Sequence, residues 1–63
     1  MRTGIIESID THHLEGVLLD ENDQEIHFYL DSDNPTLKIS TKVYFEIALT
    51  HRGLVAVQLT PYG

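Results

Sequence analysis

Residues 42–51, KVYFEIALTH, alternate between large apolar side chains and polar or smaller ones. A two-residue period with β-branched and aromatic residues predicts a β-strand that turns one face to a core. Helical spacing of the apolar residues fits the segment less well. The predicted strand points Val43, Phe45, Ile47 and Leu49 inward and Tyr44, Glu46, Ala48 and Thr50 outward.

Further short apolar segments predict strands, each bounded by turn-forming residues. They are residues 4–10, 14–20, 25–30 and 54–59. ENDQ at 21–24 and the pair Arg52-Gly53 are typical of tight turns, whereas DSDNPTLKIST at 31–41 is a longer excursion. The chain therefore has five predicted strands and no convincing helix.

A chain of 63 residues forms one domain, residues 1–63, and buries about 60% of its unfolded surface on folding. Short strands with one apolar face leave exposed edges unless the sheet closes on itself. We therefore expect an all-β fold, a five-stranded antiparallel barrel, monomeric by default.

The alternation also assigns faces in the other strands. The inward residues of the third and last strands are Ile26, Phe28 and Leu30, and Val55, Val57 and Leu59, while His27 and Tyr29 point outward. In the first segment Ile5, Glu7 and Ile9 share one face, which leaves Ile6 on the other. We expect a bulge or sharp bend there, as barrels need at their corners.

Ten acidic residues against four basic ones give a formal net charge of −6, which opposes electrostatic capture of phosphate backbones. The basic residues Arg2, Lys38, Lys42 and Arg52 are scattered along the chain. The absence of cysteine excludes disulfides and thiolate zinc sites, and it fits a cytoplasmic protein. No apolar run approaches membrane-spanning length, and the N-terminus lacks the pattern of a signal peptide, so we expect no membrane partner.

No catalytic or metal-binding motif in the sequence has all the residues that it requires. Asp20, Asn22 and Gln24 have the spacing of a calcium loop, but Glu25 stands where that loop needs glycine, and Asp31 replaces its bidentate glutamate. The histidines lack the spacing of a zinc enzyme, and no serine has the glycine elbow of a nucleophile. We expect no enzyme activity, no cofactor, no metal and no small-molecule substrate.

Along nearly its whole length the chain resembles the bacterial cold-shock domain. The resemblance rests on Gly4, Gly16, KVYFEI at 42–47, Gly53 and AVQL at 56–59, together with the short acidic turn before the third strand. It implies a barrel of the oligonucleotide-binding (OB) type that binds single-stranded nucleic acid.

The residues that carry this activity in the family are largely replaced. The motif lysine-glycine-phenylalanine-glycine-phenylalanine-isoleucine falls on residues 13–18, with Glu15 and Val17 in place of both rings. The motif valine-phenylalanine-valine-histidine-phenylalanine falls on 26–30, and the family's lysine-tryptophan pair falls on Glu7 and Ser8. A base stacked on a ring contributes about 1–3 kcal/mol, so losing three rings should weaken binding by about two orders of magnitude.

The resemblance thus implies weak binding of single-stranded RNA or DNA through the face of the second and third strands. The residues expected to contribute are His27, Tyr29, Val17, Glu15, Ser8 and Glu7, with the basic side chains of Lys38, Lys42 and Arg52. Two alternatives stay open. The patch of Val17, His27 and Tyr29, rimmed by Glu7 and Glu15, is a surface for a protein partner, or its residues are plain strand formers with no ligand.

Overall fold

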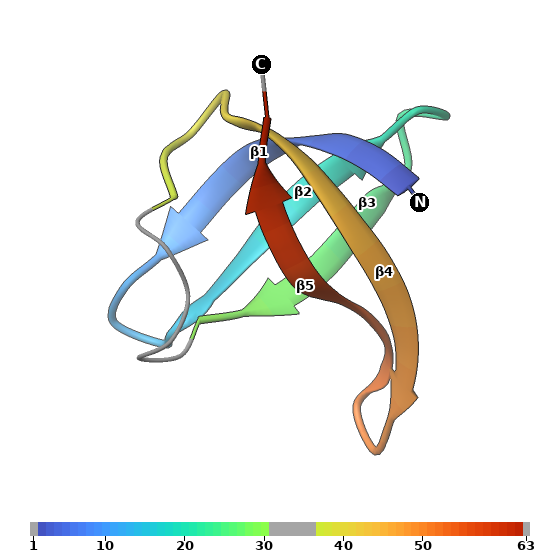
Figure 1. Ribbon diagram of the computed structural model, residues 1–63. Coiled ribbons are helices and arrows are strands. Elements are labelled where there is room, and N and C mark those ends of the chain that lie inside the picture. The colour runs from blue at the N-terminus through green and yellow to red at the C-terminus, as the bar shows by residue number, and fades with distance from the viewer. Residues whose placement is uncertain (1, 31–36, 63) are drawn as a thin grey trace.

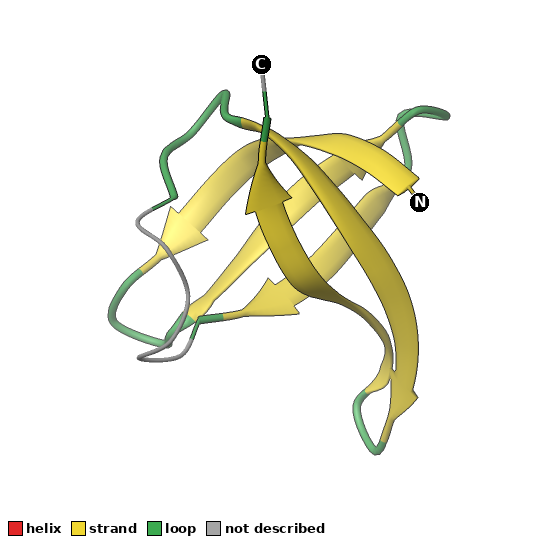
Figure 2. Ribbon diagram, in the orientation of Figure 1, coloured by secondary structure: helices red, strands yellow, loops and turns green. Residues whose placement is uncertain are grey.

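The computed structural model describes residues 2–30 and 37–62, which form a closed barrel (Figure 1). Its strands are β1 (Arg2–Asp10), β2 (Glu15–Asp20), β3 (Glu25–Tyr29), β4 (Lys42–Thr50) and β5 (Gly53–Pro61). The described residues contain no helix (Figure 2). The prediction of an all-β, five-stranded barrel is confirmed, and the architecture is consistent with an OB-type barrel.

The expectation that all strands are antiparallel is wrong at one boundary. Around the barrel the order is β1-β2-β3-β5-β4, and β3 and β5 run parallel, paired at Phe28 and Ala56. The reason is geometric, because strand directions can alternate around a closed ring only when the number of strands is even. With five strands, one neighbouring pair must share a direction.

The bulge expected in the first strand is confirmed. The register of β1 against β2 shifts between Ile6 and Ser8, which makes Glu7 the extra residue. As a result Ile6 and Ile9, three positions apart, both pack toward the core, while Ile5 is 46% exposed.

A second bulge lies in β5, where the alternation of apolar residues did not predict one. The register shifts between Tyr44 and Glu46 of β4, so β5 contributes one residue more than β4 at this point. Gln58 has a φ of 56°, in the left-handed region. The inward face changes accordingly: Ala56 is 3% exposed, whereas Val57, predicted to point inward, is half-buried.

The core is made of apolar side chains from all five strands. Those fully buried are Phe28, Phe45, Ile6, Leu18 and Val43. Gly16 lets β2 come close to Phe28, because a Cβ at this position would overlap the ring. Leu37 also joins the core, although residues 31–36 of the predicted loop lie outside the described residues.

The hairpin of β4 and β5 extends away from the rest of the barrel (Figure 1). Leu49, predicted to point into the core, is 79% exposed, and its cross-strand partner Leu54 is 65% exposed. The two-residue period continues along β4 beyond the point where an opposite wall exists, so the prediction for Leu49 is wrong.

Candidate nucleic-acid interface

The outer face of β1, β2 and β3 brings together the residues predicted from the family motifs. Ser8 pairs with Val17, and Val17 pairs with His27, which sets these three residues side by side. In the adjoining row Glu15 pairs with Tyr29. These predicted residues therefore lie next to one another on one contiguous surface.

This surface is acidic. The pKa of Glu7 is raised, first by a hydrogen bond with the Glu25 side chain, then by desolvation and by the charge of Glu25. Glu7 belongs to β1 and Glu25 to β3, so their side chains meet over β2, the strand that lies between the two. Glu15 adds a further carboxylate in the row of Tyr29. Phosphate groups would meet repulsion over most of this face.

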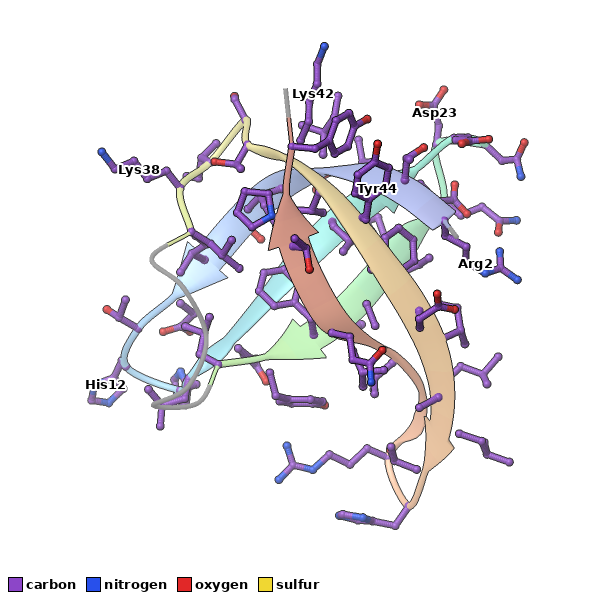
Figure 3. All side chains as sticks on the ribbon, in the orientation of Figure 1. Arg2, His12, Asp23, Lys38, Lys42 and Tyr44 are labelled. Atoms are coloured by element: carbon purple, nitrogen blue, oxygen red, sulfur yellow. The ribbon has the colours of Figure 1, made fainter. Side chains whose placement is uncertain are left out.

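The predicted basic residues do not gather on one surface. Lys42 opens β4 and pairs with Ile5 of β1, and Lys38 lies in the segment that precedes β4 (Figure 3). Arg52 alone of the three predicted cations reaches the platform: its Cζ lies 4.5 Å from the centroid of the Tyr29 ring. Such a cation–π contact at an exposed site contributes about 0.5–1 kcal/mol.

Arg52 and Tyr29 line a cleft of about 440 Å³, here named the Tyr29 cleft. Its other polar residues are His13, Thr50 and His51, and its apolar residues are Leu14 and Leu30. The turn after β1, the end of β3 and the β4–β5 turn meet here. The cleft thus combines an aromatic ring, a guanidinium and two imidazoles.

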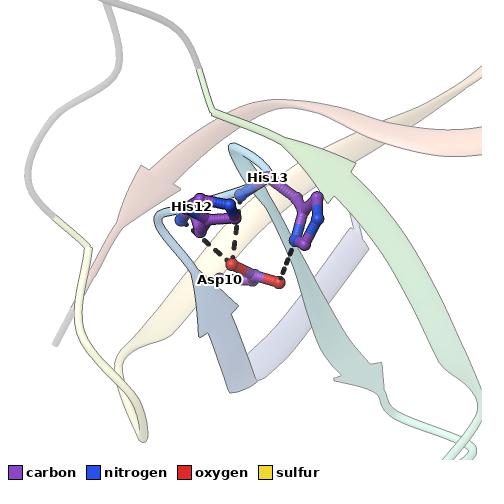
Figure 4. Close-up of polar contacts among 3 residues, drawn as sticks. All are labelled: Asp10, His12 and His13. Atoms are coloured by element: carbon purple, nitrogen blue, oxygen red, sulfur yellow. Dashed lines mark hydrogen bonds and ion pairs between the residues drawn. The ribbon is translucent and has the colours of Figure 1, made fainter.

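Asp10 fixes the turn that carries His13 (Figure 4). Its Oδ1 accepts hydrogen bonds from the backbone N–H groups of His12 and His13 at 3.0 and 3.1 Å, and its Oδ2 lies 2.8 Å from His13 Nδ1. The hydrogen bond with His13 lowers the pKa of Asp10, and the same contact raises the pKa of His13. His13 therefore keeps its positive charge to a higher pH than an isolated histidine does.

His13 and His51 were not among the residues predicted to bind. Their signal in the sequence is their position: His13 aligns with the lysine that opens the family's first motif, and His51 adjoins Arg52 at a turn. Only the fold shows that these two turns meet, since residues 13 and 51 are far apart in the chain.

No protein-family model matches the chain, and no curated protein is similar to it at a significant level. Within residues 2–30 and 37–62, no group of three or more histidine or acidic side chains is placed to hold a metal ion. The described part of the chain also has no helix long and apolar enough to cross a membrane.

Proposed function

We propose that this protein is a cold-shock-like binding module that holds single-stranded RNA or DNA weakly, through the Tyr29 cleft rather than across the whole outer face of β1–β3. The observation that carries the proposal is the guanidinium of Arg52 over the Tyr29 ring, at 4.5 Å, in a cleft that His13 and His51 also line. Aromatic rings and guanidinium planes stack on unpaired bases, and cationic side chains contact the phosphates.

The size of the cleft fits a short footprint. Its volume of about 440 Å³ lies in the usual range of small-ligand pockets, which corresponds to a nucleotide rather than a long strand. The base stacks on the outer side of the Arg52 guanidinium, so the contact between Arg52 and Tyr29 persists. Leu14 and Leu30 supply apolar contacts beside it. A single stacked base contributes about 1–3 kcal/mol.

Electrostatics keeps the affinity low. Arg52 and protonated His13 attract phosphates at the cleft, but Glu7, Glu15 and Glu25 repel them over the neighbouring strands. For single strands, the logarithm of the binding constant falls by about 0.7 per phosphate neutralised for each tenfold rise in salt. Contact with one or two phosphates therefore gives a shallow slope, on the order of −1.

Titration of the isotope-labelled protein with oligothymidine at low salt tests this function. We expect amide shifts at residues 13–14, 29–30 and 50–52, and stronger binding as the pH falls and His13 becomes protonated. Arg52→Gln should weaken binding by roughly fivefold or more, because it removes both the stacking plane and the charge. Lys38→Gln is the matched control, since Lys38 is exposed, carries the same charge and does not line the cleft.

Unchanged amide shifts at millimolar oligonucleotide contradict the proposal, and so do equal losses in the two variants. Submicromolar affinity at physiological ionic strength would contradict the restricted footprint. If the protein does not bind nucleic acid, the remaining expectation is a protein partner on the patch of Val17, His27 and Tyr29. A basic partner whose binding shifts residues 17 and 27, with the Arg52 amide unmoved, would identify that function.

A further inference from the structure

A second hollow lies between the first parts of β3 and β5, at the end of the barrel where the β4–β5 hairpin extends outward. Its volume is about 330 Å³, and its apolar walls are Ile26, Ile47 and Leu54. Arg2, Asp20, Gln24, Glu25 and His27 form its polar lip. We refer to it as the β3–β5 groove. The β3–β5 groove shares no lining residue with the Tyr29 cleft.

The groove exists because β3 and β5 meet at a single pair. Within the described residues, their register is limited to Phe28 and Ala56, and nearer the start of each strand the groove separates them. Residues 25–27 of β3 are paired with β2 along one edge only. Backbone groups alternate between the two edges of a strand, and Gln24 and Leu30 bond to the β2 side, so Ile26 faces β2 as well. Glu25 and His27 therefore turn their N–H groups to the other edge, which a further strand can pair with.

The groove also exposes apolar surface that a folded chain normally covers. Leu54 is 65% exposed, and Ile26 and Ile47, which pack against the core, are partly accessible beside it. An open strand edge next to a line of apolar side chains is the arrangement that binds extended peptides: the edge pairs with the peptide backbone, and alternate side chains enter the hollow.

We propose that the β3–β5 groove docks an extended, lysine- or arginine-containing segment of a partner protein, which adds a strand to β3 at residues 25–27. The charge selects this occupant. Asp20 and Glu25 outnumber Arg2 on the lip, and the chain as a whole carries a formal charge of −6. A nucleic-acid strand meets repulsion here, and a second copy brings the same excess of negative charge. An alternating apolar and basic peptide fits both the walls and the lip.

A labelled peptide of alternating valine and lysine residues provides the probe. We expect binding by fluorescence anisotropy, with amide shifts at residues 25–27 and slowed hydrogen exchange at Glu25 and His27, whose N–H groups face away from β2. Leu54→Lys should weaken binding about tenfold or more, because it replaces an apolar wall by a charge that repels the peptide. A valine and glutamate peptide of the same length should bind much more weakly.

Leu49→Lys is the matched control. Leu49 is the cross-strand partner of Leu54, is exposed as well and gains the same charge, but it does not line the groove. Its affinity should fall much less than that of Leu54→Lys, because Leu49 is not a wall of the groove and its replacement removes no apolar contact with the peptide. Equal losses in both variants, equal binding of the glutamate peptide or unchanged exchange at Glu25 and His27 would overturn the proposal. A dimer of the protein alone that Leu54→Lys abolishes would also overturn it, by assigning the groove to a second copy.

Discussion

Replacement of Gly16 by alanine should destabilise the barrel strongly. An added Cβ would overlap the ring of Phe28 and lie 2.8 Å from the backbone oxygen of Ser8. Neither neighbour can yield easily. Phe28 is fully buried at the centre of the core, and the Ser8 oxygen belongs to the backbone of β1, which pairs with β2. The two strands must therefore move apart, or the ring must leave its rotamer.

The size of the effect follows from packing. Forcing one extra carbon into a filled core typically costs about 1–3 kcal/mol. At roughly 0.05–0.15 kcal/mol per residue, a chain of 63 residues has a total stability of about 3–9 kcal/mol. The substitution thus removes a substantial part of it, and the Tm should fall by roughly 5–20 °C.

Urea unfolding followed by circular dichroism and tyrosine fluorescence measures this loss, since the chain has no tryptophan. The m-value should stay constant while the midpoint falls. Gly53→Ala is the comparison: Gly53 has no atom within 4 Å of the added Cβ but a φ of 94°, so its cost of about 1 kcal/mol comes from the backbone alone. A Gly16→Ala midpoint equal to that of the original protein would refute the packing argument.

Three other changes have defined outcomes. Asp10→Asn should lower the pKa of His13 toward its ordinary value of 6.5, as measured by imidazole proton shifts. Because folding raises the pKa of His13, the ion pair stabilises the barrel fully below pH 6.5 while Asp10 is charged. This contribution is lost as the pH rises through the raised pKa. Glu25→Gln should lower the pKa of Glu7 toward 4.5, as measured by carboxyl carbon shifts. In the original protein the raised pKa of Glu7 makes the barrel less stable as the pH rises above 4.5, and the variant should lack this pH dependence. Phe45→Ala should cost about 3–5 kcal/mol, a third or more of the total stability of about 3–9 kcal/mol, and should lower the urea midpoint of the circular dichroism transition accordingly.

The fold was largely predictable because the chain repeats a simple physical pattern. Two-residue alternation located all five strands, and the broken alternation around Glu7 located the bulge of β1. The alternation failed where the surroundings of a strand change along its length. Leu49 lies beyond the barrel wall, and the bulge at Gln58 moves Ala56 inward in place of Val57. Neither feature can be recognised from the local residue pattern.

The candidate site was predictable only in part, for a related reason. Strand pairing in order along the chain set Ser8, Val17 and His27 side by side, as the sequence indicated. The contact of Arg52 with Tyr29 depends instead on barrel closure, which no local pattern encodes. The contribution of His13 depends on the same closure, and its raised pKa depends on the turn that Asp10 fixes.

The parallel junction of β3 and β5 has a consequence for how the chain folds. The β1–β2–β3 meander and the β4–β5 hairpin join residues close in sequence, so each can form early, whereas Phe28 and Ala56 must meet across nearly half the chain. Closure at this junction should therefore come late on the folding pathway. Substitutions at Ala56 would then accelerate unfolding while leaving the refolding rate nearly unchanged.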